Sequence, residues 1–213
     1  MAEVPRLLVI ETATAACSVA LLANGAVLAE RHELVGRGHA ERLIPMIGEL
    51  PGGGRADAIL VDVGPGSFTG VRVGLAAARG LAIGWGVPVH GYSSLALVAA
   101  AGFAGDADLD RLSVVLEGGH GEVFLQHFAA PLIETAPLAS LRPEAALASL
   151  DGRAALGSGI RHLAALAEGL DLREALPRAA DALLLPPDFA TLPPRPLYGR
   201  GPDAKTLAER GLA

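Results

Sequence analysis

The stretch Gly64-Pro-Gly-Ser-Phe-Thr-Gly-Val-Arg72 decides the fold of this chain more than any other segment. It follows the apolar run 58–63 and precedes a long segment of small and apolar residues. Gly64 and Gly66 allow backbone angles that a Cβ would hinder, and Pro65 cannot continue a strand because it lacks an amide hydrogen. The sequence therefore predicts a strand that ends with the apolar run, then a tight turn and a helix.

The start of this predicted helix has a side-chain cap and an open question about anion binding. Ser67 or Thr69 can accept hydrogen bonds from the unpaired amides of the first turn, which also contains Gly70. Such amides favour a bound anion, but most strand-turn-helix units only connect a strand to a helix and bind no phosphate. The dinucleotide-binding pattern is excluded because Thr69 stands in the place of its third glycine, and the P-loop pattern Gly-Lys-Ser/Thr is absent.

The helix predicted over 69–85 is apolar on almost every side. Its only charged residues are Arg72 and Arg79. One apolar stripe is formed by Val71, Leu75, Ala78, Ala82 and Trp85. Such a helix is buried on more than one side, so a sheet covers one face and something else covers the other. That second cover is either another layer of this chain or a partner protein.

Composition limits the classes of function. The chain has 213 residues, of which 51% are hydrophobic, so it can bury a large core in one or two domains. Its net charge of −6 excludes a large basic surface, so a partner would supply most phosphate contacts to any nucleic acid. The single cysteine, Cys17, excludes an internal disulfide and is expected to be a small buried residue in a strand.

Hydropathy predicts no membrane association. The apolar run 7–10 is too short for a signal peptide, and the segment 73–87 is interrupted by Arg79 and by glycines. We therefore expect a cytoplasmic protein.

The first half of the chain is predicted to form three strands followed by alternating helices and strands. Asn24-Gly25 predicts a hairpin because both positions tolerate positive φ, and Pro45 is expected to kink or loosen the first helix. The predicted strands are 6–10, 16–22, 26–33, 58–63 and 87–90, and the predicted helices are 38–50, 69–85 and 95–101. Three antiparallel strands, a helix, a parallel strand and a helix form the order of a ribonuclease-H-like lobe, as in the actin-like ATPases (the ASKHA group).

The second half predicts a smaller, degenerate lobe of the same α/β class. The predicted strands are 112–116, 122–128 and 154–156, the predicted helices are 143–150 and 159–168, and the proline-rich segment 186–196 is expected to run extended. We place the boundary near residue 105, with an N-terminal lobe at 1–105 that carries the partner-binding helices. The C-terminal lobe, with the proline-rich tail, is placed at 106–213.

Groups that could carry catalysis are scarce. The six histidines show no spacing that brings two of them onto one helix turn or strand face, so no metal site is predicted. Glu11 ends the first strand, where ATPases with this lobe place an acidic residue that organises the metal, and is therefore the best acid candidate. The following residues 12–16 contain none of the glycines that wrap a phosphate, so ATP hydrolysis by this chain is disfavoured.

Several segments together resemble the TsaB family, also called YeaZ. They are 10–21, His39-Ala-Glu-Arg-Leu-Ile-Pro-Met46, the motif 64–72, and Pro196-Leu-Tyr198 with Arg200. Two positions depart from the family pattern. The segment 117–122 reads Glu-Gly-Gly-His-Gly-Glu where the family usually has Asp-Ala-Arg-x-Gly-Glu, and Glu11 replaces the usual aspartate.

The resemblance implies a noncatalytic accessory subunit rather than an enzyme. Members support the subunit TsaD in making N6-threonylcarbamoyladenosine at adenosine 37 of tRNAs that read ANN codons. TsaE is the further implied partner, tRNA is reached through the complex, and a homodimer is implied when TsaD is absent. No cofactor is expected on this chain alone, since ATP and metal belong to the partner subunits.

The resemblance also implies where the partner binds. In the family, the first two helices of the N-terminal lobe join the partner's helices in a bundle. The side chains implied to lie near the contact are Leu43, Met46, Ile47, Val71, Leu75, Ala78 and Ala82. The family's motif turn corresponds to Gly64, Pro65, Gly66, Ser67, Thr69 and Gly70.

Two other classes of function remain to be weighed. An actin-like or sugar-kinase-like ATPase is the alternative, and it requires tight ATP binding by the isolated chain. A peptidase requires a nucleophile with a nearby base or a pair of metal ligands, and the sequence pattern indicates neither.

Overall fold

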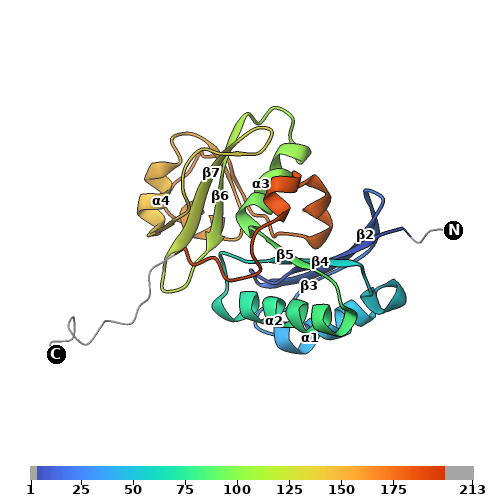
Figure 1. The fold of residues 1–213 in the computed structure, drawn as a ribbon. Helices are drawn as coiled ribbons and strands as arrows, with labels where there is room; N and C mark the ends of the chain where they lie inside the picture. Colours follow the sequence, from blue (N-terminus) through green and yellow to red (C-terminus); the bar gives the residue numbers. More distant parts are fainter. Residues whose placement is uncertain (1–3, 200–213) are drawn as a thin grey trace, which may run out of the picture.

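The computed structural model describes residues 4–199, and Arg200 lies outside the described residues. Two β-sheets lie beside each other with helix α3 (Ser94–Gly105) between them, as Figure 1 shows. The first sheet has the strand order β3-β2-β1-β4-β5, in which β1, β4 and β5 run parallel. This order is that of a ribonuclease-H-like lobe, so the predicted fold class is confirmed.

The strands of the first sheet agree closely with the sequence pattern. Their bounds are β1 (Arg6–Glu11), β2 (Ala16–Ala23), β3 (Ala26–Leu34), β4 (Ala58–Asp62) and β5 (Val89–Tyr92). Asn24 and Gly25 have φ of 53° and 69°, as a tight hairpin between β2 and β3 requires, so the predicted hairpin is confirmed. Cys17 is buried in β2, and burial raises the pKa of its thiol to about 12.

β5 begins two residues later than predicted. Its first partner in β4 is Ile59, which pairs with Val89, while the amide of Ile59 donates to the carbonyl of Pro88. Pro88 has no amide hydrogen to give to the ladder. The strand therefore starts after the proline instead of before it.

Two helices cover the outer face of the first sheet. They are α1 (His39–Gly48), followed by the 3-10 turn η1 (Pro51–Gly54), and α2 (Phe68–Trp85), and they lie side by side in Figure 1. Helix α1 continues through Pro45. Ser67 caps α2 by accepting a hydrogen bond from the amide of Gly70 at 3.1 Å, as predicted, and Gly86 ends it in the left-handed conformation.

The side chains predicted to contact a partner are instead inside this chain. The seven residues are at most 8% exposed and form one core with β1, β2 and β4: Leu43, Met46, Ile47, Val71, Leu75, Ala78 and Ala82. The physical reason is that the strongest apolar stripe of each helix faces the nearest sheet, which belongs to the same chain. Any partner on these helices would therefore meet other side chains.

The second sheet repeats the strand order of the first and has one additional short strand. Its path is β11-β10-β6-β7-β8, with β9 also paired to β7. The bounds are β6 (Arg111–Glu117), β7 (Val123–Ala129), β8 (Ile133–Glu134), β9 (Ala139–Leu141), β10 (Ala154–Leu156) and β11 (Leu172–Arg173). Helices α4 (Pro143–Ser149) and α5 (Ile160–Ala164) flank β10 in the chain. Helix α5 is shorter than the predicted 159–168.

The last described segment returns to the first sheet. The 3-10 turn η3 (Pro187–Ala190) interrupts the stretch 186–196 that was expected to run extended, and a second 3-10 turn, η2 (Ala179–Leu184), precedes it. Pro187 suits a helical first turn because its amide would be unpaired there in any case. The amide of Ala179 donates to Ser18 Oγ at 2.9 Å, and Leu192 pairs with Gly91 of β5. Within residues 4–199, no helix is long and apolar enough to cross a lipid bilayer.

Candidate functional site

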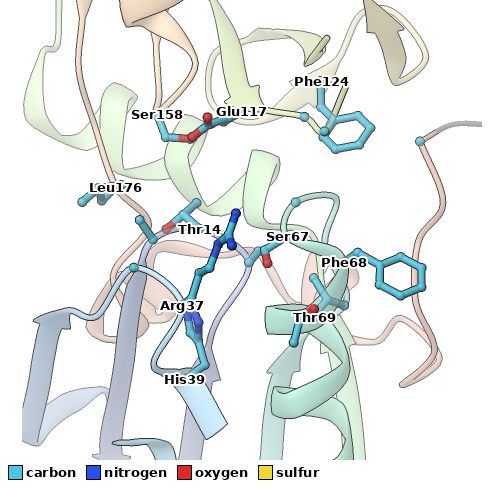
Figure 2. A pocket seen from close by; sticks show the side chains of 18 of the residues that line it. Thr14, Arg37, His39, Ser67, Phe68, Thr69, Glu117, Phe124, Ser158 and Leu176 are labelled. Carbon is cyan, nitrogen blue, oxygen red and sulfur yellow. The ribbon is translucent and has the colours of Figure 1, made fainter. Parts of the chain in front are cut away.

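A large cavity lies between the two lobes. It measures about 1880 Å³ and is lined by the turn after β1, the segment 32–39, the start of α2, the segment 117–120 and the residues around Tyr198. Figure 2 shows Thr14, Arg37 and Ser67 on one side of this cleft and Glu117, Phe124 and Ser158 on the other. An ATPase would need a cavity for its nucleotide, so the cleft is the place to test that alternative function.

The motif glycines bring α2 against the turn after β1. A Cβ at Gly66 would lie 2.1 Å from the carbonyl oxygen of Ala13, and one at Gly70 would lie 2.1 Å from that of Thr12. A Cβ at Gly74 would lie 2.3 Å from Thr12 Oγ1. No side chain fits at such distances, so these three positions require glycine. The turn after β1, which contains no glycine, therefore packs directly against residues 66–74.

Beneath this turn lies a buried acidic pair, Glu11 and Asp62. Asp62 Oδ1 accepts hydrogen bonds from the amide of Thr12 at 2.8 Å and from Thr12 Oγ1 at 3.0 Å. Burial raises the pKa of Asp62 to about 7. Burial, together with the neighbouring Asp62 charge, raises the pKa of Glu11 well above its usual range. Both shifts favour the protonated form of the two carboxyl groups.

Glu11, the predicted acid candidate, is fully buried and directed at partners within the chain. Its Oε1 accepts from the amide of Ala13 at 2.8 Å, and its Oε2 accepts from the hydroxyls of Ser94 at 2.9 Å and Tyr92 at 3.1 Å. Across residues 4–199, no group of three or more His, Cys, Asp or Glu side chains is arranged to hold a metal ion. Glu11 is therefore held by partners within the chain and does not line the cleft.

The walls of the cleft are richer in functional groups than its floor. Arg72 of α2 lies over the ring of Phe68, with its guanidinium carbon 3.3 Å from the ring centroid, and donates to Tyr198 Oη at 3.2 Å. On the opposite wall, Arg161 forms an ion pair with Glu117 at 2.5 Å. Glu117 belongs to the segment that departs from the family pattern, and its partner could not be found from spacing because 44 residues separate the two in sequence.

Solved structures with this arrangement identify the family. A protein described as YeaZ from Pseudomonas aeruginosa superposes with a TM-score of 0.72 and 30% sequence identity, covering 84% of this chain and 89% of that one. The chain belongs to the TsaB family, also called YeaZ.

Sequence relatives agree with the assignment to TsaB. The tRNA threonylcarbamoyladenosine biosynthesis protein TsaB of Escherichia coli is 40% identical over 124 residues, which is 56% of this chain and 53% of that protein. The match therefore spans about half of the curated TsaB protein. An uncharacterised protein of Mycobacterium bovis is 31% identical over 97% of both chains. The family model TsaD: tRNA N6-adenosine threonylcarbamoyltransferase matches residues 32–136.

One polar cluster escaped the sequence patterns. His127 Nδ1 lies 2.7 Å from Ser113 Oγ, and His127 Nε2 lies 3.0 Å from Ser149 Oγ. The sequence did not predict this cluster, because its three residues lie on β6, β7 and α4 and are far apart along the chain. Ser113 is fully buried between the strands, and burial lowers the pKa of His127. The cluster satisfies buried polar groups and lies outside the cleft residues.

Proposed function

We propose that this chain is a noncatalytic subunit that binds TsaD and supports the formation of N6-threonylcarbamoyladenosine at adenosine 37 of tRNAs that read ANN codons. The names of the curated TsaB relatives and the TsaD family model support this pathway. The turn after β1 supports an accessory role over hydrolysis, because it has no phosphate-binding glycines and packs tightly against residues 66–74. ATP and metal then belong to the partner subunits, TsaE joins the assembly, and tRNA is reached through the complex.

The observation that carries this proposal is the outward face of α1 and α2. Ile83 of α2 is 84% exposed and Ile44 of α1 is 52% exposed, although both are large apolar side chains. Gly80 lies on the same face, and a Cβ added there would meet no atom within 4 Å. A glycine in a helix interior costs about 1 kcal/mol relative to alanine, and the isolated chain has no packing reason for it. A partner helix that approaches closely supplies the reason.

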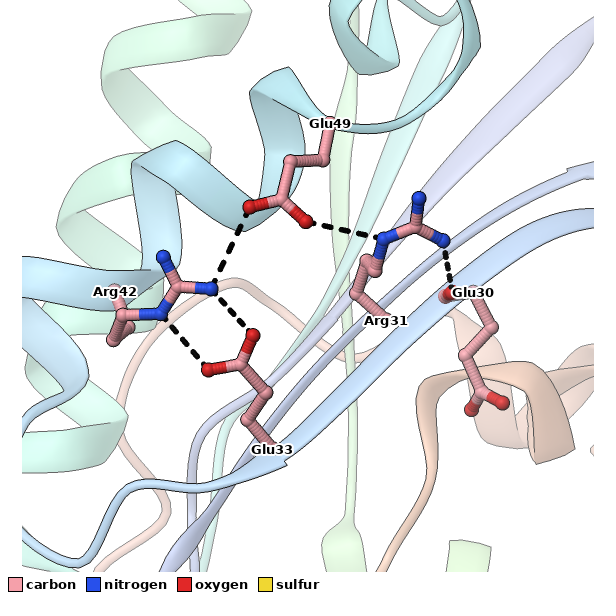
Figure 3. A network of polar contacts seen from close by, with 5 residues as sticks. All are labelled: Glu30, Arg31, Glu33, Arg42 and Glu49. Carbon is pink, nitrogen blue, oxygen red and sulfur yellow. Dashed lines mark hydrogen bonds and ion pairs between the residues drawn. The ribbon is translucent and has the colours of Figure 1, made fainter.

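Helix α1 is held in place for such a contact by an ion network, drawn in Figure 3. Arg42 of α1 bonds through Nε to Glu33 of β3 at 2.9 Å and lies 3.5 Å from Glu49. Glu49 in turn accepts from Arg31 of β3 at 3.1 Å. Exposed pairs of this kind contribute little energy singly, but the four groups together tie the end of α1 to the sheet. The helix can therefore present its outer face as a rigid surface.

The same outward face suits a second copy of this chain. Its residues Ile44, Gly80 and Ile83 lie on adjacent helices, so a two-fold axis can place the patch against itself. We propose that the chain forms a homodimer through this face when TsaD is absent. TsaD then competes with the second copy.

Co-purification with TsaD tests the proposal. Ile83→Asp and Ile44→Asp place a charge in the proposed contact and are expected to abolish TsaD binding and to convert the homodimer to a monomer in light scattering. Ile133→Asp is the matched control because Ile133 is also exposed but lies on β8 of the second sheet. Unchanged binding by both α-helix variants would remove the proposed face, and loss in the control would show that the effect is not local.

A further inference from the structure

The interlobe cleft is larger than a small-molecule site. Its volume of about 1880 Å³ compares with roughly 300–1000 Å³ for pockets that enclose a drug-sized ligand. Its floor is closed by the backbone of Ala13 against Gly66 and of Thr12 against Gly70 of α2, so a di- or triphosphate finds no cradle there. The dimensions suit a segment of a longer polymer that passes through the open mouth.

Aromatic rings gather at that mouth. Phe68 is 71% exposed and Tyr198 is 66% exposed, and Arg72 holds both by lying over the Phe68 ring and bonding to the Tyr198 hydroxyl. Phe124 projects from the opposite wall in Figure 2, and a Cβ at Gly199 would lie 2.6 Å from its ring. Exposed rings whose positions are fixed by a guanidinium and by backbone contacts are suited to stacking against flat ligands.

The charge of the lining is opposite in sign to that of the chain. Four arginines and two glutamates line the cleft, without any lysine or aspartate, whereas the chain as a whole carries −6. Within residues 4–199, Arg37 makes no ion pair, and Figure 2 shows its side chain reaching into the cleft. Arg72 likewise has aromatic and carbonyl partners but no carboxylate among the described residues. The cleft therefore favours an anion.

We infer that the interlobe cleft binds single-stranded RNA, with an unstacked base against Phe68 and phosphates at Arg37 and Arg72. Unpaired RNA presents flat bases and a regular row of phosphates, and proteins recognise it by stacking bases on aromatic rings and arginine planes. A duplex keeps its bases stacked and offers no free face to these rings. The inference rests on the proposed function, which would supply the RNA as a tRNA loop.

Fluorescence anisotropy tests the inference with a labelled RNA stem-loop that carries a single-stranded loop. A fully paired RNA duplex of the same length is the second probe, and AMP and a polyglutamate peptide are competitors. The full-length chain is measured alone and in its complex with TsaD. The stem-loop is expected to bind more tightly than the duplex, with neither competitor displacing it at equal concentration.

Single-residue variants distinguish the contribution of base stacking to RNA binding from the contribution of charge. Phe68→Ala is expected to weaken stem-loop binding by about tenfold to a hundredfold, and Phe68→Trp is expected to restore it because a ring is retained. Arg37→Ala is expected to reduce the dependence of log K on log salt by about one, whereas Arg111→Ala, an exposed arginine outside the cleft, leaves it unchanged. Phe68 and Arg37 are exposed, so the fold should tolerate these changes.

Several results would contradict the inference that the cleft binds single-stranded RNA. Equal affinity for stem-loop and duplex, or wild-type affinity in both Phe68→Ala and Arg37→Ala, would overturn the inference. Displacement by AMP would assign the cleft to a free nucleotide, and displacement by polyglutamate would assign it to an acidic peptide. The same variants are tested for TsaD co-purification. Retained TsaD binding with unaltered RNA binding would refute the cleft assignment and leave the proposed function standing.

Discussion

The two faces of helix α2 use glycine for opposite reasons. On the inner face, Gly70 and Gly74 lie so close to Thr12 that an added Cβ would approach its oxygen atoms to 2.1 and 2.3 Å. On the outer face, Gly80 and Gly84 have no atom within 4 Å of the same added Cβ. The inner glycines are explained by this chain alone, whereas the outer ones are not.

This difference separates folding from association within one helix. The inner face packs against the turn after β1, and its apolar side chains fill the core of the first lobe. On the outer face, the glycines lower the stability of the isolated helix. The exposed Ile83 beside them leaves an apolar surface. Mutations on the two faces should therefore separate stability from binding.

The largest expected contrast is between Leu75→Asp and Ile83→Asp. Leu75 is 3% exposed in the core, so a carboxylate there has no partner and should lower the free energy of unfolding by at least about 3–4 kcal/mol, enough to unfold much of the protein. Ile83→Asp should change it by only about 0.5 kcal/mol. Urea titration followed by circular dichroism measures both. Similar losses in the two variants would mean that the outer face is also part of the fold.

The acidic pair beneath the inner face should make stability depend on pH. The pKa of Asp62 is raised from 3.8 to about 7, so between these values the folded state binds more protons than the unfolded state. Stability from this group is therefore greatest below about pH 4 and falls as pH rises toward 7, by a few kcal/mol. The lowered pKa values of His32 and His127 act in the opposite direction below pH 6.5.

Asp62→Asn isolates the contribution of the pair because the amide oxygen can still accept from Thr12. Urea titrations at pH 5 and pH 8 should show a larger difference in unfolding free energy for the unaltered chain than for this variant. Asp110→Asn is the control, since Asp110 is almost fully exposed. If Asp62→Asn retained the whole pH difference, groups other than Asp62 would be responsible for the pH dependence of stability.

The sequence predicted the first lobe well because its signals are local. Alternation, the Asn24-Gly25 pair and the 64–72 motif each act over a few residues, and the structure places the strands and the capped helix where they indicate. The direction of the helix faces was not predictable in the same way. Helix α2 is apolar on both sides, so periodicity could not decide whether Leu75 faces its own sheet or a partner.

Features formed by distant segments escaped the sequence for a different reason. The contacts of Arg161 with Glu117, of Arg72 with Tyr198 and of His127 with Ser113 depend on how the strands pair and on the return of the chain after residue 178. None of these residues forms a motif by spacing. The basic character of the cleft was hidden for the same reason, because the negative charges that give the chain its net −6 lie mostly elsewhere.

The smallest expected effect is also the sharpest test of the two glycine classes. Gly80→Ala should raise the free energy of unfolding of the isolated chain by about 0.5–1 kcal/mol, because alanine favours the helix and its methyl group enters open space. Gly74→Ala should lower it, because its methyl group would lie 2.3 Å from Thr12 Oγ1. Thermal unfolding monitored by circular dichroism measures both shifts. A loss of stability at Gly80 would show that the chain itself needs this glycine, and the argument that a partner helix explains it would then fail.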